Sequence, residues 1–383
     1  MKILAVGGGS GGHVTPVVAV LREIRDRQPE AEIRFWCDRK FAPQARSTMA
    51  SFDESIRIDT IFAGKLRRYH HLTIWQQLTW FSLVAQNVKD LFLVVAGLLQ
   101  SFFKLLLWRP DVVFTKGGYV CLPVGMAAHV LGIPLVIHDS DAHPGLTNRV
   151  LSRWATTIAT GAPLEFYNYD RSKSHYVGIP IDRRFRPFSA SEQHRAKLDW
   201  GLDAGRPLVV VTGGGLGAQR INQAVISELD NLRKSVSVAL ISGAAHYDEL
   251  KSQLPPNSTD WQLHAFVTDM PSLVGAADLV VARAGATTIL ELAASSKPTI
   301  LLPNAKLTGG HQLKNAAVYA AEDAVVVLDE STFDDNPGLL TSEINRLIAQ
   351  SGETKAMAER FSRFVKPDAA NKMADLVLAA ARR

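Results

Sequence analysis

At 383 residues the chain is longer than one hydrophobic core usually organises, which predicts roughly two or three domains and excludes a small binding module. Apolar residues make up 47% and charged residues 21%, a balance typical of a globular protein and not of a disordered or collagen-like one. The net charge of +5 is uneven, because residues 1–177 hold 20 basic and 14 acidic residues whereas residues 178–383 hold 22 and 23. Such dilute charge does not indicate a nucleic-acid partner, but it suits an anionic surface or a phosphorylated ligand.

The short apolar runs of the chain are followed by glycines and then by helical patterns, an alternation that predicts βα units and parallel sheets. In chain order the predicted strands are residues 3–6, 33–36, 112–115, 135–137, 208–212, 236–241, 279–282 and 299–302. The last segment, residues 369–383, has the pattern of a helix. Two α/β domains are expected, with a boundary between residues 177 and 178, where an apolar strand end runs into a Gly- and Pro-bearing connection.

One segment before the third predicted strand, residues 75–108, is unusually rich in Leu, Val and Phe, and residues 91–108 approach the length of a membrane span. Gln100 and Lys104 interrupt it, and a strand follows almost at once. Three interpretations stay open: a buried helix pair packed on the sheet, an interfacial surface that also meets the membrane, and a true span.

The two cysteines, Cys37 and Cys121, lack the spacing of a metal site or a redox pair, which predicts reduced thiols in a cytosolic protein. The run from Met1 to Val6 leads straight into glycines, without the longer apolar region and cleavage site of a signal peptide. Export by that route is not expected.

A strand, a glycine turn and a helix follow one another twice, first at residues 7–12 and again at residues 213–218. Such a turn gathers backbone N–H groups at the positive end of a helix dipole, where a diphosphate can approach closely. Each motif alone also fits two other interpretations: a tight turn that binds no ligand, and the dinucleotide site of a dehydrogenase. A dinucleotide site has an acidic residue further along the chain, which Asp38 matches loosely. Two such turns, with His13 directly after the first, favour a nucleotide-sugar enzyme.

The motif from Gly7 to Pro16, GGGSGGHVTP, resembles the opening of the MurG family, transferases that add N-acetylglucosamine to a lipid-linked muramyl-pentapeptide. Further motifs similar to that family follow in the same order over nearly the whole chain: KGGYV at 116–120, His138 with GLTNR at 145–149, GG and GA around the second turn, RAGATT at 283–288 with Glu291, and His311-Gln312 with Asn315-Ala316. Each glycine turn is common to many enzymes, whereas the ordered set is specific.

This resemblance implies a GT-B glycosyltransferase with two Rossmann-like domains facing a cleft, which is inverting and needs neither a metal nor another cofactor. Residues 1–177 would form the acceptor- and membrane-facing domain, with helix 366–383 packed back on it, and residues 178–365 the UDP-sugar domain. The implied partners are UDP-GlcNAc, a polyprenyl-diphosphate-linked muramyl-pentapeptide and an anionic membrane surface, with no nucleic acid. The implied location is peripheral, on the cytoplasmic face of the cell membrane.

An inverting transfer is a single displacement that needs a base for the acceptor hydroxyl and stabilisation for the departing UDP. His13 matches the family histidine that is the base or positions the acceptor, and a role as a helix cap or a diphosphate contact stays open. Glu291 is the candidate for the ribose hydroxyls, and Val267 for a backbone contact to uracil. The resemblance implies these substrate-binding residues: Ser10, Gly11, Gly12, Asp141, Asn148, Asp182, Arg183, Gly215, Val267, Arg283, Ala286, Thr287, Thr288, Ile289, Leu290, Glu291, His311, Gln312 and Asn315.

Three departures from the family pattern alter the expected contacts. Its Glu-Gln-Asn is Asp139-Ser140-Asp141 here, its serine in the second turn is Gly215, and the arginine after its Gly-x-Pro linker aligns with Asp182. The acidic triplet looks like the metal site of other glycosyltransferases, although glycine N–H groups and helix dipoles can stabilise UDP without a metal. The alternatives are therefore a related glycolipid glycosyltransferase with another UDP-sugar or a diacylglycerol acceptor, and a non-catalytic, membrane-associated nucleotide-sugar-binding protein.

Overall fold

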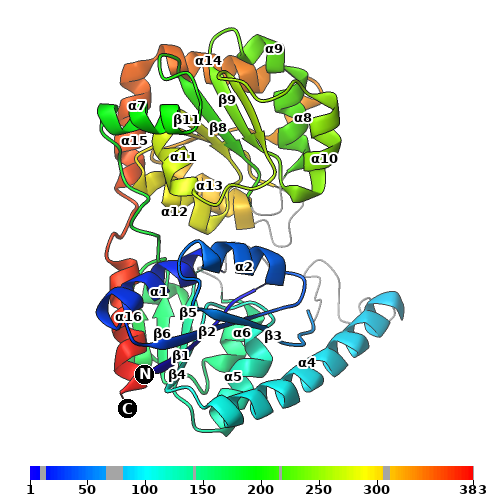
Figure 1. The fold of residues 1–383 in the computed structure, drawn as a ribbon, viewed down its shortest axis with the longest axis vertical. Helices are drawn as coiled ribbons and strands as arrows, with labels where there is room; N and C mark the ends of the chain where they lie inside the picture. The colour runs from blue at the N-terminus through cyan, green and yellow to red at the C-terminus, as the bar shows by residue number, and fades with distance from the viewer. Residues whose placement is uncertain (9–13, 66–80, 141–143, 215–217, 305–310, 383) are drawn as a thin grey trace. The chain divides into compact units, whose positions relative to one another are not determined.

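The computed structural model describes residues 1–8, 14–65, 81–140, 144–214, 218–304 and 311–382, without the side chains of residues 81, 82 and 311. The chain divides into two compact units, one formed by Met1–Asp182 with Lys366–Arg383 and the other by Arg183–Val365. Each unit is built around one parallel sheet with helices on both faces (Figure 1). The first unit extends five residues beyond the expected boundary at residue 177, because Asp182 forms an ion pair with Arg22 inside this unit.

The sheet of the first unit has seven parallel strands in the order β3-β2-β1-β4-β5-β6-β7. The chain runs from β1 outward to β3 and resumes at β4 on the other side, so the topological switch point lies between β1 and β4. The strands are β1 (Lys2–Val6), β2 (Glu32–Cys37), β3 (Arg57–Thr60), β4 (Val112–Thr115), β5 (Leu135–Asp139), β6 (Thr157–Thr160) and β7 (Ser174–Tyr176).

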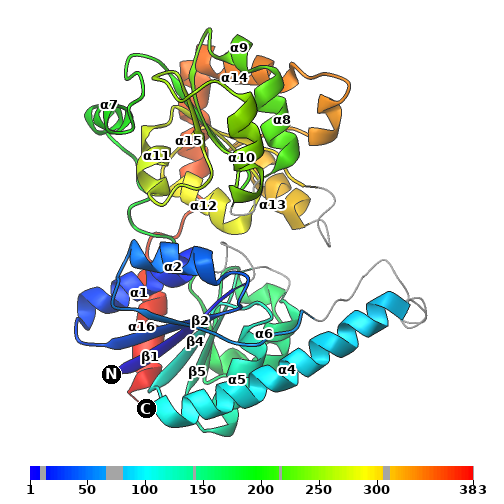
Figure 2. The ribbon, with the colours of Figure 1, turned by 45° about the vertical axis from the view of Figure 1, so that its right-hand side comes forward.

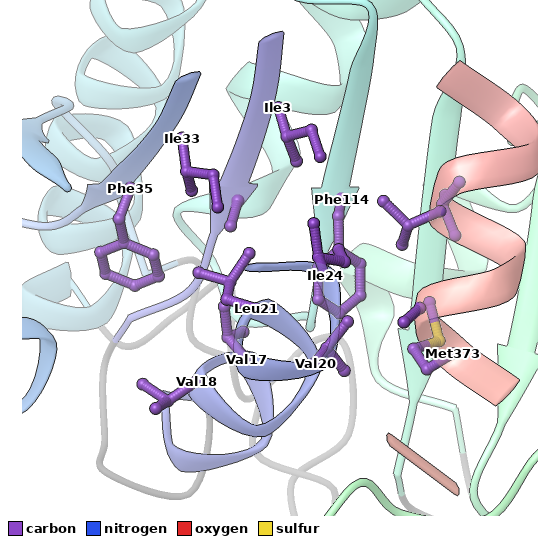
Figure 3. Close-up of a cluster of buried hydrophobic side chains, with 14 of the residues drawn as sticks. Ile3, Val17, Val18, Val20, Leu21, Ile24, Ile33, Phe35, Phe114 and Met373 are labelled. Carbon is purple, nitrogen blue, oxygen red and sulfur yellow. The ribbon is translucent and has the colours of Figure 1, made fainter. Parts of the chain in front are cut away.

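One face of this sheet is covered by α1 (Thr15–Arg27), α2 (Ala42–Ala50) and the C-terminal helix α16 (Ala369–Ala381). Figure 3 shows α1 and α16 contributing side chains to one buried cluster with three strands. The labelled members are Ile3, Val17, Val18, Val20, Leu21, Ile24, Ile33, Phe35, Phe114 and Met373. The last helix of the chain thus completes the core of the first unit.

The opposite face carries α4 (Phe81–Trp108), α5 (Cys121–Val130) and α6 (Leu146–Leu151). Helix α4 runs along α5 on the outside of the unit (Figure 2). Two glycines bring α4 against the segment after β3: a Cβ on Gly97 would lie 1.9 Å from the carbonyl oxygen of Phe62, and one on Gly64 would lie 1.9 Å from that of Asp90. This close contact fixes which side of α4 faces the protein. The described part of the unit also contains two short 3-10 helices, at Leu164–Phe166 and Arg171–Lys173.

The second unit has six parallel strands in the order β10-β9-β8-β11-β12-β13, with the switch point between β8 and β11. The strands are β8 (Leu208–Thr212), β9 (Ser237–Ile241), β10 (Trp261–His264), β11 (Leu279–Ala282), β12 (Thr299–Leu301) and β13 (Val326–Val327). The helices are α7 (Ala190–Asp199), α8 (Gln219–Ser227), α9 (Leu229–Leu232), α10 (Ala244–Gln253), α11 (Met270–Ala276), α12 (Ala286–Ala294), α13 (His311–Ala320), η5 (Glu330–Phe333), α14 (Leu339–Ala349) and α15 (Ser351–Ser362). Both glycine turns of the sequence therefore follow the strand that borders a switch point, where open α/β sheets bind ligands.

Candidate active site

The first glycine turn begins at the carboxyl end of β1, beside the end of β4. Gly7 donates its N–H to the carbonyl oxygen of Trp36, and the N–H of Lys116 donates to that of Val6. A Cβ on Gly8 would lie 2.7 Å from a carboxylate oxygen of Asp38, so a side chain does not fit there. Residues 9–13, which include the candidates Ser10, Gly11, Gly12 and His13, lie outside the described residues.

Asp38, which loosely matches the acidic residue of a dinucleotide site, is 5% exposed. Its carboxylate forms hydrogen bonds with the neighbouring backbone. Its Oδ1 accepts the N–H groups of Lys40 and Phe41 at the start of α2, each at 3.1 Å. Burial and the neighbouring Asp38 carboxylate raise the pKa of Tyr119. These contacts give Asp38 a role in the fold and weaken the dehydrogenase interpretation.

Asn148, a predicted binding residue, lies at the start of α6 with 4% of its surface exposed. Its amide donates to the carbonyl oxygen of His138 at the end of β5, 3.2 Å away. The same amide nitrogen would lie 3.2 Å from a Cβ on Gly117, whose φ of +95° already favours glycine. Asn148 thus joins the ends of β4 and β5, while the neighbouring candidate Asp141 lies outside the described residues.

The candidates Asp182 and Arg183 lie on either side of the division between the two units. The Asp182 carboxylate is 3.6 Å from the guanidinium of Arg22 on α1 and is largely buried. The residue that replaces the family arginine is therefore held by the first unit.

In the second unit the second glycine turn follows β8, beside the end of β11. Gly214 has a φ of +79°, and its N–H donates to the hydroxyl of Thr212 at 3.1 Å. The next candidate, Gly215, lies outside the described residues. Because Thr212 pairs with Ala282 in the sheet, this turn and the segment 283–285 leave the same edge.

The helix α12 begins at this edge with Gly285 as its N-cap and without a side-chain cap. The candidates Ala286, Thr287 and Thr288 form its first turn, where backbone N–H groups and the helix dipole favour an anion. Ile289 is fully buried and anchors the helix in the core, whereas Leu290 and Glu291 are partly exposed. This arrangement suits a diphosphate at the helix start and leaves a carboxylate one turn further along.

The candidates on α13 contact the same edge. The side-chain oxygen of Gln312 accepts the N–H of Asn304 at 2.8 Å, and the amide of Asn315 donates to the carbonyl oxygen of Ala284 at 3.2 Å. The side chain of His311 is not described. Val267 is buried and follows the edge strand β10. The structure therefore brings together the second turn, the start of α12 and α13.

Arg283 is expected from the sequence to face a diphosphate, but its guanidinium contacts other groups of the protein. It lies 2.6 Å from the carboxylate of Glu330 and donates to the carbonyl oxygen of Leu302 at 2.9 Å. Both members of the ion pair are less than a tenth exposed. Arg283 thus ties the end of β11 to η5.

We expect Arg283→Met to lower the free energy of unfolding by about 3–5 kcal/mol, because it leaves the Glu330 carboxylate buried without its cation. Urea unfolding followed by circular dichroism measures this loss. The double variant with Glu330→Gln should recover most of it, since both charges are then gone. Unchanged stability of the single variant would show that the pair does not stabilise the fold.

The acidic triplet Asp139-Ser140-Asp141 looks in sequence like a metal site. Asp139 is 3% exposed, and its Oδ2 accepts the hydroxyl hydrogen of Tyr169 at 2.8 Å. Burial and this carboxylate raise the pKa of Tyr169. Within the described part of the chain no three His, Cys, Asp or Glu side chains gather in a way that could hold a metal ion.

Lys116 lies in the motif KGGYV and Ser140 in the acidic triplet, but neither is among the site residues expected from the sequence. Both lie at the carboxyl edge of the first sheet, and the ammonium of Lys116 donates to the hydroxyl of Ser140. The signal in the sequence is a lysine directly after an apolar strand and before two glycines.

Comparisons with known proteins agree with this architecture. Residues 3–160 match the glycosyltransferase family 28 N-terminal domain, and residues 208–373 match the C-terminal domain of that family. A relative from Listeria welshimeri, named UDP-N-acetylglucosamine--N-acetylmuramyl-(pentapeptide) pyrophosphoryl-undecaprenol N-acetylglucosamine transferase, is 32% identical over 381 residues that cover 99% of each chain. A relative of the same name from Exiguobacterium is 31% identical over 388 residues, covering 98% of this chain and 99% of the relative.

Solved structures show the same fold. The crystal structure of Acinetobacter baumannii MurG has a TM-score of 0.66 at 22% identity and covers 99% of both chains. The calicheamicin glycosyltransferase CalG4 has a TM-score of 0.64 at 15% identity, with 100% of this chain and 98% of that chain covered. The two parallel-sheet α/β domains, together with the matches to both glycosyltransferase family 28 domains, identify the chain as a GT-B glycosyltransferase. Within that class, the chain belongs to the MurG family of N-acetylglucosaminyltransferases.

Proposed function

We propose that this protein transfers N-acetylglucosamine from UDP-GlcNAc to the 4-hydroxyl of lipid-linked N-acetylmuramyl-pentapeptide, which converts lipid I to lipid II in peptidoglycan synthesis. The observation that carries the proposal is the full-length similarity, at 31–32% identity, to relatives named for this reaction. The glycine turns at both switch points support it, because the reaction needs one diphosphate site for the donor and one for the acceptor.

A transfer assay with radiolabelled sugar tests this proposal. UDP-GlcNAc, UDP-glucose and UDP-galactose are each offered with lipid-linked muramyl-pentapeptide and with diacylglycerol as acceptors. We expect incorporation from UDP-GlcNAc into the muramyl lipid. Incorporation into diacylglycerol alone would favour the related glycolipid glycosyltransferase, and saturable UDP binding without transfer to any acceptor would favour the non-catalytic protein.

In this proposal the second unit holds the donor, with the diphosphate at the start of α12 and the ribose hydroxyls at Glu291. The partial exposure of Glu291 and its place six residues beyond the Gly285 N-cap, about one and a half helical turns, support this assignment. A carboxylate accepts hydrogen bonds from two neighbouring hydroxyls, which an amide replaces only in part.

We expect Glu291→Gln to raise the KM for UDP-GlcNAc by about 10- to 100-fold, since hydrogen bonds to a charged group are lost. The KM for the acceptor should change little. Glu359→Gln, at an exposed position of α15, is the matched control and should leave both values unchanged. Equal KM values for UDP-GlcNAc in the two variants would remove Glu291 from the donor site.

We further propose that the protein binds peripherally to the cytoplasmic face of an anionic membrane through α4. Between Leu91 and Leu107 all eight exposed residues of this helix are apolar. The exposed fraction is 70% for Phe92, 56% for Leu99 and 58% for Phe103. An exposed apolar stripe of this length is typical of an interaction surface and not of a helix that faces water.

Along the stripe, the polar side chains of α4 face the protein: Gln100 and Lys104 are partly buried and Ser101 is buried. This inverts the usual pattern of a surface helix. Gln100 accepts the N–H of Phe62 and donates to the carbonyl oxygen of Thr60, and the ammonium of Lys104 is 3.3 Å from the carboxylate of Asp59. These contacts, with the close approach at Gly97, hold the apolar stripe outward.

Of the three interpretations of residues 75–108, the buried helix pair does not fit the described part, in which α4 is one helix with an exposed apolar stripe. The segment Leu83–Trp108 is long and apolar enough to cross a membrane, and 28% of its most apolar window is buried. Because its inner face packs on α5 and on the segment after β3, we favour a helix lying in the membrane interface over a span. The exposed Lys89 and Arg109, near either end of the stripe, suit anionic lipid headgroups.

A further inference from the structure

The segment after β2 carries basic side chains without acidic neighbours. Residues 39–52 contain three basic residues, Arg39, Lys40 and Arg46, and no acidic one. All three are exposed, and none of them forms an ion pair with another described residue. We call these three residues the α2 basic cluster. The positive charge of the first unit is thus locally concentrated where no counter-charge of this segment balances it.

The neighbouring helix α1, on the same face of the sheet, provides a contrast. Two of its arginines are paired: Arg25 lies 2.7 Å from the carboxylate of Asp53, and Arg27 lies 2.6 Å from that of Asp375. Like charges that share a helix face repel one another, so the α2 basic cluster does not stabilise the fold by itself. Such an arrangement is typical of a surface whose negative charges come from a partner.

Helical geometry places the α2 basic cluster on one outward face. The helical winding begins before α2 itself, because the N–H of Ala42 donates to the carbonyl oxygen of Asp38 at 3.1 Å. Arg39 and Arg46 are seven positions apart, about two turns, and therefore point to the same side. The opposite side of the helix is buried in the core through Ala42, Ala45 and Met49. This burial holds the basic side chains outward.

The α2 basic cluster begins next to the first glycine turn. A Cβ on Gly8 would lie 2.7 Å from a carboxylate oxygen of Asp38, the residue directly before Arg39. The other carboxylate oxygen accepts the N–H groups of Lys40 and Phe41, each at 3.1 Å, which fixes the backbone that carries the basic side chains. A ligand held at this glycine turn therefore has the α2 basic cluster as its neighbour along the carboxyl edge of the sheet.

The membrane is not the partner that this position favours. Helix α2 packs on the same face of the first sheet as α1 and α16, whereas α4 packs on the opposite face through Leu105 and Trp108. The apolar stripe of α4 points away from the sheet, so a membrane bound to it lies on the other side from α2. The position of the α2 basic cluster thus favours an anionic group of a ligand over lipid headgroups.

We propose that the α2 basic cluster binds carboxylates of the acceptor's peptide. The inference rests on the proposed function, in which the muramyl sugar of the acceptor carries a pentapeptide. This peptide is joined to the sugar through its amino end, so its C-terminal carboxylate is free and ionised at neutral pH. Guanidinium groups bind carboxylates through paired, charge-assisted hydrogen bonds. With the diphosphate at the first glycine turn, the peptide can extend along the carboxyl edge to α2.

Kinetics of the full-length protein with a detergent-solubilised acceptor test this role, because detergent removes the contribution of membrane binding. The double variant Arg39→Gln with Arg46→Gln should raise the KM for the muramyl-pentapeptide lipid by about 3- to 30-fold, since two exposed ion pairs are lost. The KM for UDP-GlcNAc should stay within about twofold of the wild-type value. The variant Arg39→Lys with Arg46→Lys keeps both charges and should recover most of the acceptor affinity.

A second acceptor, whose peptide carboxyl groups are all converted to carboxamides, shows whether the arginines contact the peptide. The wild-type protein should bind this acceptor more weakly, because the carboxylates are gone. The KM ratio between the glutamine double variant and the wild type should then fall to about one, since neither protein has an ion pair left to lose. The same ratio for both acceptors would overturn the inference.

The matched control is Arg153→Gln with Arg171→Gln. Both arginines are exposed and precede the strands β6 and β7, so they lie at the opposite edge of the same sheet. This control should leave the acceptor KM unchanged, and equal acceptor KM values in the two glutamine double variants would overturn the inference. Weaker vesicle binding by Arg39→Gln with Arg46→Gln, together with an unchanged KM in detergent, would assign the α2 basic cluster to lipid and overturn it as well. Absence of transfer by the wild-type protein to either acceptor would instead contradict the proposed function.

Discussion

Replacing His13 with alanine should lower kcat by about 10²- to 10⁴-fold, the usual contribution of a general base, and leave the affinity for UDP within about twofold. The physical reason is that inverting transfer requires removal of the acceptor's hydroxyl proton as the bond to the sugar forms. His13 lies outside the described residues, but the elements before and after it are firmly anchored. Strand β1 is central in its sheet, and α1 buries seven residues in the core.

Single-turnover transfer with saturating donor measures this effect, and exogenous imidazole should restore part of the rate if the histidine is the base. His175→Ala, at an exposed position of β7, is the matched control and should transfer normally. A raised KM for the acceptor with an unchanged kcat in His13→Ala would show that the histidine only positions the acceptor. Unchanged turnover would remove it from the site.

The double variant Phe92→Glu with Leu99→Glu should bind anionic phospholipid vesicles about 10²- to 10⁴-fold more weakly than the wild type. Each substitution removes an apolar side chain worth roughly 1.5–3 kcal/mol on burial and adds a charge that the lipid repels. Both side chains are more than half exposed, so the fold should be retained. Co-sedimentation with vesicles measures the binding.

The matched control is Phe166→Glu with Leu198→Glu, which changes the same residue types at positions that are 59% and 57% exposed outside α4. It should bind vesicles like the wild type. Transfer to a detergent-solubilised acceptor should be normal in both double variants, because the chemistry does not involve the stripe. Equal vesicle binding by the two variants would contradict the assignment of α4.

The strands with continuous apolar runs were predictable from sequence, and all eight expected ones are present. The strands that escaped prediction lie mainly toward the sheet edges and carry polar residues: β3 reads RIDT, β7 reads SHY and β10 reads WQLH. Their pairing depends on neighbours that lie far away in the sequence, and local patterns do not record those contacts. The two Rossmann-like halves were nevertheless predicted correctly, because the two glycine turns identify the first strand of each half. The GT-B class was also predicted correctly, from the resemblance to the MurG family.

The parts of the candidate site that depend on backbone geometry were predictable from the sequence. The parts that depend on contacts between distant side chains were less predictable. The helix start at Gly285 follows from the motif alone, and the structure places Gln312 and Asn315 beside it. In contrast, nothing local in the sequence reveals that Arg283 is paired with Glu330, 47 positions later. The outward stripe of α4 also required the structure, because its inner polar contacts depend on the segment after β3.

The packing of α16 against α1 has a consequence for how this protein folds during its synthesis. Met373, Ala374, Val377 and Leu378 fill the core that α1 shares with the first sheet, although more than 340 positions separate the two helices. The first half of the chain therefore leaves the ribosome with part of its apolar surface uncovered, and this surface stays uncovered until α16 has been made. The second half can close its own core earlier, so we expect the part of the chain that is made last to fold before the part that is made first.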